Sequence, residues 1–413
     1  MTPTWFFFPA DTDFGPANLP YGIFSTSDRA PRAGLAVGNQ VLDLFAAAQF
    51  GLFHKVNFDH DALQRATLND LIACGKTVTN GIRHVIQQHL TDENSPLRNA
   101  PRVWVSQASA TLHLPVAVGD YTDFYSSIEH ATNVGKLFRD PDNALLPNWR
   151  HLPVGYHGRA SSIVVSGTPI RRPSGQTLPK GATTPRFGPS QRVDFELEMG
   201  FIIGRNNELG QAVSTATAAD HIFGLVLFND WSARDIQQWE YVPLGPFLGK
   251  SFASTMSPWV VPLEALGPFR VPGPAQVPSP LPYLQGSGAQ NYDITLAVEL
   301  TPADGQRTVI CESNTKYLYW NMAQQLAHHT SNGCNLRVGD LLASGTISGP
   351  GRGSYGSLLE ISEGGKTAIP LGDQTRIFLE DGDTVTLRAH AGTGAGRVGF
   401  GEATGQLLAA IEH

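Results

Sequence analysis

Positions 193–203 read Val193-Asp-Phe-Glu-Leu-Glu-Met-Gly-Phe-Ile-Ile203, and this stretch decides which kind of fold the chain adopts. Polar and apolar residues alternate over its first half with the period of a β-strand, and its second half is apolar. Successive strand side chains point to opposite faces, so Asp194, Glu196 and Glu198 share one face. The pattern therefore predicts a strand that carries a row of acids along one side.

That acidic face has two interpretations. Neighbouring carboxylates repel one another unless solvent or a cation compensates their charge. A spacing of i and i+2 suits a hard cation such as Ca²⁺ or Mg²⁺, which prefers oxygen ligands. The same alternation is ordinary for a half-exposed strand with a solvated face, and for this stretch taken alone solvation is the more ordinary interpretation.

Outside this strand, the chain divides into two parts that differ in their sequence patterns. Residues 1–115 form a mixed module, in which two short apolar runs flank Gly38-Asn39 and predict a hairpin over 34–44. Apolar residues then recur every three or four positions, which predicts helices over 61–74 and 80–90. We expect a structural domain over 1–115 and a second domain over 116–413.

The second part consists of short apolar runs separated by glycine and proline. Strands are predicted over 162–166, 193–203, 224–229, 294–300, 340–343, 357–361 and 384–390. Helices are predicted over 121–138, 218–222, 233–240 and 319–328. Seven prolines lie between positions 262 and 282, which predicts an irregular segment. The fold class that follows is α+β, mostly β, with a curled sheet, barrel or roll.

Composition restricts the partners and the compartment. The 413 residues include 36 acidic and 29 basic ones, so the net charge is -7, which argues against binding nucleic acid or anionic membranes. Three scattered cysteines, Cys74, Cys311 and Cys334, are typical of reduced thiols in a cytosolic enzyme. The segment 1–9 has no basic leader pattern, and no apolar run is long enough for a membrane span. We expect a cytoplasmic protein.

Two further segments supply acids and a histidine. The apolar run 225–230 ends in Asp230 just before a predicted helix, where the carboxylate either binds a ligand or caps the helix. If 121–138 is helical, Asp123 and His130 share one face about 10 Å apart along the axis. A single histidine on a helix is more often structural, but beside several acids a general base becomes a reasonable interpretation.

Polar donors follow the Asp230 strand. Arg234, Gln237 and Tyr241 are spaced i, i+3 and i+7 on the predicted helix, so they share one face. Lys250 follows after a loop rich in glycine and proline. Together Arg234, Gln237 and Lys250 could donate to a developing oxyanion, although for these residues in isolation an exposed polar helix face is the better explanation.

Several longer blocks of the sequence carry a resemblance to a known family. They are Asn18-Leu-Pro-Tyr-Gly-Ile-Phe-Ser25, Asp120-Tyr-Thr-Asp-Phe-Tyr-Ser-Ser127, His130-Ala-Thr-Asn-Val-Gly135, Leu152-Pro-Val-Gly-Tyr-His-Gly-Arg-Ala-Ser-Ser162, Phe228-Asn-Asp-Trp-Ser-Ala-Arg-Asp-Ile-Gln-Gln-Trp-Glu-Tyr241, Gly345-Thr-Ile-Ser-Gly-Pro350 and Arg397-Val-Gly-Phe-Gly401. Over nearly its whole length the chain resembles eukaryotic-type members of the fumarylacetoacetate hydrolase family.

The resemblance implies an architecture and an activity. The expected architecture is a small N-terminal SH3-like barrel followed by a catalytic β-roll domain, assembled as a homodimer. The expected reaction is hydrolysis of a carbon–carbon bond in 4-fumarylacetoacetate, a small β-diketo acid, to fumarate and acetoacetate. This is the last step of tyrosine and phenylalanine catabolism. Members of the same fold that hydrolyse acylpyruvates or decarboxylate oxo-acids are the alternative, as is a catalytically silent cation-binding protein.

The resemblance also implies the site residues, all of which are present. The ligands of Ca²⁺ and/or Mg²⁺ would be Asp123, Glu196, Glu198 and Asp230, with Lys250 and Ser254 beside a second cation. The catalytic groups would be the base His130, its orienting partner Glu360, and the oxyanion donors Arg234, Gln237 and Lys250. The substrate contacts would be Tyr125, Arg139, Tyr156, Gln237, Tyr241 and Thr346. Where the family commonly has Gly-Thr, this chain has Ala253-Ser254, which keeps the hydroxyl oxygen.

Overall fold

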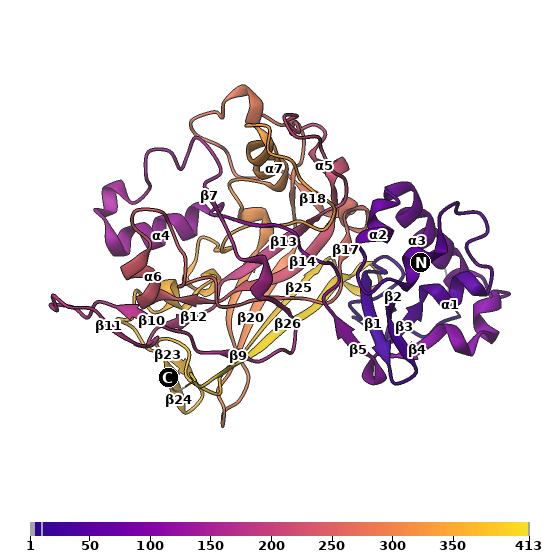
Figure 1. The fold of residues 1–413 in the computed structure, drawn as a ribbon, viewed down its shortest axis with the longest axis horizontal. Coiled ribbons are helices and arrows are strands. Elements are labelled where there is room, and N and C mark those ends of the chain that lie inside the picture. The colour runs from indigo at the N-terminus through magenta and orange to yellow at the C-terminus, as the bar shows by residue number, and fades with distance from the viewer. Residues whose placement is uncertain (1–4, 10, 412–413) are drawn as a thin grey trace.

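The computed structural model describes residues 5–9 and 11–411. The secondary structure is mostly β, with helices packed around the sheets, which confirms the predicted fold class (Figure 1). The prediction made for the opening segment 1–9 falls partly outside the described residues. Over residues 5–9 and 11–411, no helix combines the length and the apolar content that crossing a bilayer demands.

The N-terminal part of the chain forms a five-stranded antiparallel sheet. Its strands are, in spatial order, β4 (Trp104–Ser106), β3 (Gln40–Asp43), β2 (Arg29–Val37), β1 (Tyr21–Thr26) and β5 (Thr111–His113). The hairpin predicted over 34–44 is present, because Val37 pairs with Gln40 across a turn in which Gly38 takes a φ of 56°. That φ lies in the left-handed region, where glycine has no steric penalty.

Helices in the N-terminal part only partly match the prediction. The helix expected over 61–74 is two pieces, a 3-10 helix η1 (His60–Gln64) and α2 (Asn69–Ala73), because Arg65 returns to an extended conformation between them. The helix expected over 80–90 is the longer α3 (Lys76–Thr91). A further helix, α1 (Leu44–Gln49), follows β3 directly.

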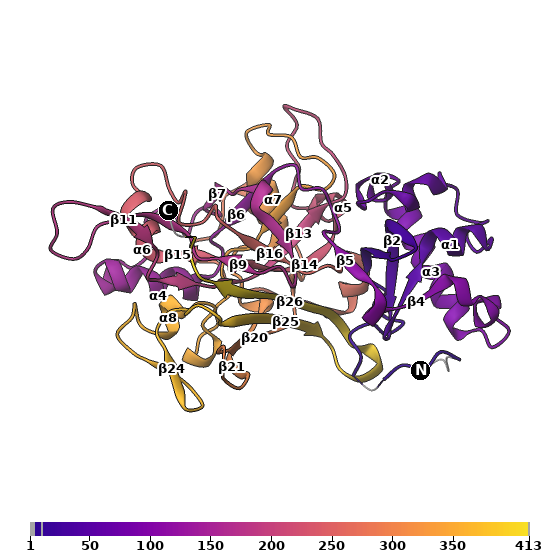
Figure 2. The same ribbon diagram turned by 60° about the horizontal axis from the view of Figure 1, so that its bottom comes forward.

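Two large sheets, accompanied by four two-stranded ones, lie in the rest of the described chain, and several of their strands can be followed in Figures 1 and 2. The eight-stranded sheet has the order β7 (Gly155–His157), β6 (Tyr121–Phe124), β22 (Leu341–Ala343), β13 (Leu197–Ile203), β14 (Ile222–Asp230), β16 (Ser254–Met256) and β8 (Ile163–Val165), with β17 (Val261–Pro262) also paired to β14. The five-stranded sheet has the order β21 (Thr308–Asn314), β20 (Thr295–Thr301), β25 (Thr384–Ala391), β26 (Val398–Leu408) and β9 (Ile170–Arg171).

Apolar residues bury both faces of the eight-stranded sheet. One face, with Leu225 and Leu227, packs on the five-stranded sheet in a common core. The other face, with Val226 and Phe228, shares a continuous core with the N-terminal sheet and helices. Tyr21 of β1 joins the two by a backbone bridge to Val260, so the N-terminal part covers a face that would otherwise be exposed. The domain limits 1–115 and 116–413 and the SH3-like form stay predictions.

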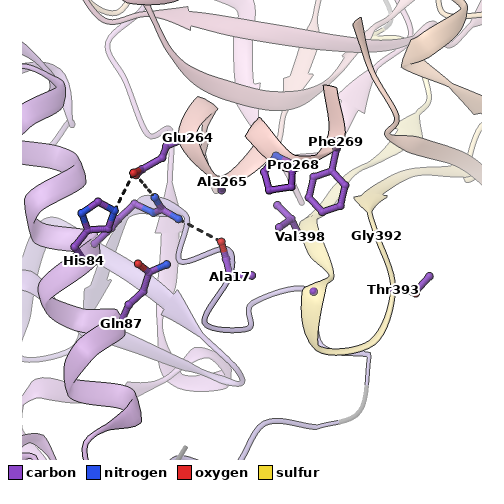
Figure 3. Close-up of a pocket in the computed structure, with 12 residues that line it drawn as sticks. Ala17, His84, Gln87, Glu264, Ala265, Pro268, Phe269, Gly392, Thr393 and Val398 are labelled. Atoms are coloured by element: carbon purple, nitrogen blue, oxygen red, sulfur yellow. Dashed lines mark hydrogen bonds and ion pairs between the residues drawn. The ribbon is translucent and has the colours of Figure 1, made fainter. Parts of the chain in front are cut away.

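A charged contact also fastens the N-terminal part to the rest of the chain, as Figure 3 shows. Arg83 of α3 is only 2% exposed, and its guanidinium binds Glu264 of the 3-10 helix η7 (Leu263–Phe269) at 2.5 Å. The neighbouring His84 binds the same carboxylate at 2.8 Å. These groups line a cavity of about 500 Å³, and none of the site residues predicted above lines it.

Three predicted elements of the second part are wrong in ways that bear on the site. The helix expected over 121–138 is the strand β6 followed by the helix α4 (Ile128–Phe138). The strand expected over 193–203 is interrupted, with β12 (Val193–Asp194) and β13 separated by two residues. The strand expected over 357–361 is a short helix, α8 (Leu358–Ile361).

The remaining predicted elements are found with shifted limits. The predicted strands at 162–166, 224–229, 294–300, 340–343 and 384–390 correspond to β8, β14, β20, β22 and β25. The predicted helices at 218–222, 233–240 and 319–328 correspond to α5 (Ala218–His221), α6 (Arg234–Glu240) and α7 (Met322–Thr330).

Candidate active site

Four carboxylates converge at one point: three lie on β6, β13 and β14 of the eight-stranded sheet, and the fourth lies in the break before β13. Each of Asp123, Glu196, Glu198 and Asp230 offers an oxygen that lies within 4.8 Å of the others, and all four residues are buried. No other such group of three or more potential metal-ligating residues occurs over 5–9 and 11–411. The solvated face that alternation alone favoured is therefore wrong, because the acids point into the protein.

Strand pairing explains this convergence. Glu198 lies opposite Phe228 in the β13–β14 pair, so Glu198 and Asp230 stand at the same end of the sheet. Asp123 lies in β6, which pairs with β22 and so reaches the same end from the other side. Glu196 stands in the break before β13, where its N–H donates to the Asn229 side chain at 3.1 Å.

The cluster has the chemistry of a cation site. Both carboxylate oxygens of Glu198 and the Oδ1 atom of Asp123 are buried without a hydrogen-bond partner in the described part of the chain. Such atoms are costly to leave unpaired. Burial, and then the charges of the neighbouring carboxylates, raise the pKa of Asp123 and of Glu198 well above their usual values. An oxygen-rich cage of this charge fits a hard divalent cation such as Ca²⁺ or Mg²⁺.

Two cationic side chains, Lys250 and Arg234, bind carboxylates of the cluster. Lys250 binds Glu196 and, at 2.9 Å, Asp230. Arg234 of α6 binds Glu196 at 2.7 Å and Asp194 at 2.8 Å. Burial opposes ionisation of Glu196, but Lys250 and Arg234, with a smaller effect of His130, hold its pKa below the usual value. The surroundings thus favour ionisation of Glu196 and oppose ionisation of Glu198.

His130 and Glu360 form a buried pair beside the cluster. The Nδ1 atom of His130 lies 2.6 Å from Oε2 of Glu360. Burial opposes ionisation of Glu360, but its contacts to His130 and then to Asn133 and Ser348 lower its pKa below the usual value. Glu360 is therefore a carboxylate that accepts the Nδ1 proton, which leaves Nε2 as the basic nitrogen. Nε2 has no hydrogen-bond partner among the described residues.

The pattern predicted Asp123 and His130 on one helix, and the structure shows that this prediction is wrong. Asp123 belongs to β6, and His130 lies in the first turn of α4, whose N-cap Ser127 accepts from the His130 N–H. The two residues meet the same site from a strand and from a helix. The parallel pairing of β6 with β22 is a long-range contact that the local pattern does not reveal.

The six predicted substrate contacts are distributed unevenly around the carboxylates. Tyr156 donates to Asp230 at 2.9 Å, and Tyr125 stacks edge-on against the His130 ring. Thr346 is buried with a hydroxyl that lacks a hydrogen-bond partner in the described chain.

The other three lie further out. Gln237 accepts from Arg234 at 3.3 Å. Arg139 is exposed and donates to the carbonyl of Ala144, although its charge still reaches Tyr125. Tyr241 is half exposed at the end of α6, and within residues 5–9 and 11–411 it makes no hydrogen bond to the carboxylates.

Three further polar residues contact the groups of the site, and of these the resemblance assigns only Ser254 to it. Ser254, predicted to stand near a second cation, lies directly opposite Asp230 in the β14–β16 pair and donates to it at 2.9 Å. Asn133 donates to Glu360 at 2.9 Å, and its i, i+3 spacing from His130 could have revealed it. Asp194 binds Arg234 instead of joining the cluster, and no signal in the sequence predicts that.

Comparisons with known proteins agree with this fold. The model of the fumarylacetoacetase N-terminal domain matches residues 17–115, and that of the fumarylacetoacetate hydrolase C-terminal domain matches residues 120–406. The chain is 53% identical over 408 residues to the fumarylacetoacetase of Rattus norvegicus, covering 97% of each chain. It is 49% identical over 406 residues to that of Arabidopsis thaliana, covering 97% of this chain and 96% of the relative.

A solved structure shares the fold at much lower identity. The fumarylacetoacetate hydrolase of Exiguobacterium antarcticum superimposes with a TM-score of 0.54 at 18% identity, over 95% of this chain and 99% of that chain. Buried acids beside a histidine–glutamate pair, together with these full-length relatives, define the chain as an enzyme of the hydrolase class. The chain belongs to the fumarylacetoacetate hydrolase family.

Proposed function

We propose that this enzyme hydrolyses a carbon–carbon bond of 4-fumarylacetoacetate with the help of a bound Ca²⁺ or Mg²⁺ ion, giving fumarate and acetoacetate. One observation carries the proposal: four buried carboxylates, with orphaned oxygens on Glu198 and Asp123, lie beside the His130–Glu360 pair. The substrate is inferred from the full-length relatives, which are fumarylacetoacetases.

His130 is the proposed general base. Its Nδ1–H is held by Glu360 at 2.6 Å, so the lone pair on Nε2 takes a proton from water. Glu360 is itself held by Ser348 and Ser357, each at 2.9 Å, and by Asn133. This fixes the ring orientation and stabilises the imidazolium that forms. The edge-on ring of Tyr125 packs against the same imidazole.

The reaction balances as a hydrolysis. The water oxygen bonds to the ketone carbon that is attached to the carbon–carbon double bond. The bond from that ketone carbon to the methylene between the two ketones then breaks. The fumaryl half leaves as a carboxylate, and the other half leaves as an enolate that takes up the proton to give acetoacetate. When bound, a hard cation supplies Lewis acidity to the two ketone oxygens. Asp123, Glu196, Glu198 and Asp230 would hold it.

In this proposal Lys250, Arg234 and Gln237 stabilise the negative charge that develops on the oxygen of the attacked ketone. The Lys250 ammonium uses two of its three protons on Glu196 and Asp230, which leaves one donor. Gln237 accepts from Arg234 through its oxygen, so its amide N–H groups stay available. Ser254, which donates to Asp230, would stand near a second cation.

Further parts of the proposal concern the substrate and the setting. Tyr156, whose hydroxyl donates to Asp230, and Thr346, whose buried hydroxyl has no partner among the described residues, would contact the substrate, as would Tyr125, Arg139, Gln237 and Tyr241. We also infer that the enzyme works as a cytoplasmic homodimer in tyrosine and phenylalanine catabolism, because the sequence resemblance implies it.

The direct test is the loss of fumarylacetoacetate absorbance on adding enzyme, with and without a chelator. We expect turnover that EDTA abolishes and that Ca²⁺ or Mg²⁺ restores. Acylpyruvates and oxaloacetate serve as competing substrates. Faster turnover of either, or full activity in EDTA with no metal bound, would refute the assignment.

A further inference from the structure

We propose that Asp194 is a positioning residue that holds the His130–Glu360 pair in place against the carboxylate cluster. This inference rests on the proposed function, since it concerns the same site. Asp194 is fully buried and, unlike its neighbours Glu196 and Glu198, lies outside the cluster of potential ligands. Its oxygens bind instead to two parts of the chain that each hold a different half of the site.

The first of these parts is helix α8, which carries Glu360. Oδ1 of Asp194 accepts from the backbone N–H of Leu358 at 2.7 Å, and Oδ2 accepts from that of Leu359 at 3.0 Å. The N–H groups in the first turn of a helix have no partner within the helix. Asp194 therefore satisfies two of them and fixes the turn from which Glu360 reaches His130.

The second part is the guanidinium of Arg234. Its Nε atom donates to Oδ2 of Asp194 at 2.8 Å, and its Nη1 atom binds Glu196 at 2.7 Å. Arg234 is thus held between Asp194 and the cluster. One buried carboxylate consequently links the cation-binding side of the site, through Arg234, to the side that carries the base, through α8.

The interruption of the predicted strand creates this link. Val193 and Asp194 pair with β15 (Ser232–Ala233), whereas Leu197 begins β13 and donates its N–H to the carbonyl of Gly356 at 2.9 Å. Glu196 forms a backbone bridge with Ser357, the N-cap of α8. The segment before α8 therefore packs into the strand break, which brings the start of the helix onto the Asp194 carboxylate.

An amide cannot replace this carboxylate. Oδ1 faces one backbone N–H, and Oδ2 faces another together with the Arg234 Nε–H. In Asp194→Asn, either orientation of the amide directs its NH₂ group at one of these donors. The start of α8 or the guanidinium must then move, and Glu360 moves with α8.

The test compares Asp194→Asn with Asp235→Asn. Asp235 lies on the same helix as Arg234 and also accepts from a backbone N–H, that of Gln191, and from a hydroxyl, that of Ser190. Within the described residues it makes no hydrogen bond or ion pair to α8 or to the cluster. Three quantities are measured on folded protein: kcat, KM for fumarylacetoacetate, and the downfield proton resonance of the short Nδ1–H bond of His130 in ¹⁵N-histidine-labelled enzyme.

We expect Asp194→Asn to lower kcat at least tenfold, to leave KM within threefold, and to shift or broaden the His130 resonance. Asp235→Asn should change none of the three. An unshifted resonance with kcat within twofold of the wild type, or equal losses in both variants, overturns the proposal. Should Asp194→Asn not fold, Asp194→Glu keeps the charge but displaces the oxygens, and the same criteria apply to it.

The two hypotheses fail separately. A wild-type enzyme that does not cleave fumarylacetoacetate refutes the proposed function, whereas the resonance still reports whether Asp194 positions His130. An active wild type whose Asp194 variants are unperturbed refutes only the role of Asp194.

Discussion

Replacing Glu198 by glutamine should stabilise the protein in the absence of a cation and abolish its response to Ca²⁺ or Mg²⁺. Both oxygens of this buried carboxylate lack a hydrogen-bond partner among the described residues, and three other acids lie within 4.8 Å of it. Two unit charges at that distance would repel by about 3.5 kcal/mol at an effective dielectric constant near 20, which opposes ionisation of Glu198 in the folded state. The amide is neutral without binding a proton and has almost the same volume.

The size of the effect follows from the raised pKa of Glu198, which is due first to burial and then to the charges of Asp123, Glu196 and Asp230. The folded state binds a proton that the unfolded chain releases above pH of about 4.3, so folded stability falls by about 1.4 kcal/mol per pH unit up to the raised pKa. Glutamine has no such loss. At pH 7 the cation-free variant should therefore exceed the cation-free wild type by roughly 2–4 kcal/mol.

The assay is thermal unfolding in EDTA and in saturating cation. Unfolding a chain of 413 residues has an entropy of about 0.9 kcal/mol/K, so the variant in EDTA should melt roughly 2–4 °C above the wild type. A cation at a hundred times its Kd adds about 2.7 kcal/mol, or about 3 °C, to the wild type alone. The exposed Glu312→Gln is the matched control and should behave as wild type. A variant that melts below the wild type in EDTA, or gains as much from the cation, refutes the reasoning.

Three further substitutions probe the base, the contact between the two parts of the chain, and a glycine beside the site. His130→Gln should lower kcat by about 10²–10⁴-fold, because general base catalysis is lost, while the thermal gain from the cation stays that of the wild type. Glu264→Gln should destabilise the protein by about 1.5–3 kcal/mol in denaturant unfolding, because the buried guanidinium of Arg83 loses a charged hydrogen bond. Gly345→Ala should cost more than about 3 kcal/mol, because φ is 74° there and the new methyl would lie 2.1 Å from the carbonyl oxygen of Phe124.

Each of these has its own check. Near-normal turnover in His130→Gln would refute the role of His130 as general base. The exposed pair of Arg352 with Glu363 serves as the comparison for Glu264, and Glu363→Gln should change stability by less than about 0.5 kcal/mol. Gly351→Ala, where the new methyl meets nothing within 4 Å, should also change stability by less than about 0.5 kcal/mol. A loss of stability in Gly345→Ala no larger than that in Gly351→Ala would contradict the argument.

Elements that depend on local signals were predictable from the sequence. β14 (Ile222–Asp230) is buried along its whole length, and its apolar run is visible in the sequence. The Gly38 turn allows Val37 to pair with Gln40, three positions later. In both cases the residues that decide the structure lie within a few positions of each other.

Elements that depend on distant partners were not predictable. Tyr121–Phe124 is a strand because it pairs with β22, more than 200 positions away, and nothing in its own four residues distinguishes it from the start of α4. Leu358–Ile361 is a helix because Ser357 caps it and Asp194, 164 positions earlier, accepts from its first N–H groups. Local β-propensity in this segment gives way to those long-range contacts.

The site shows the same division. The spacing of Glu196 and Glu198 correctly indicated that two carboxylates share one side, but it also placed Asp194 with them. Only the break at residues 195 and 196, which forms against Ser357, directs Asp194 away. Alternation along a strand identifies residues that share a face, and the partner segments decide which of them meet.

The core shared between β1 and β14 has a bearing on how the protein is made. Apolar residues up to Val116 are covered by strands as late in the sequence as Leu341. At about 5–20 residues per second, a ribosome needs roughly 10–45 seconds to synthesise the chain between them. During that time the apolar side chains of the nascent N-terminal segment are exposed, because the strands that cover them have not been synthesised. We therefore expect chaperones that act during translation to bind this segment.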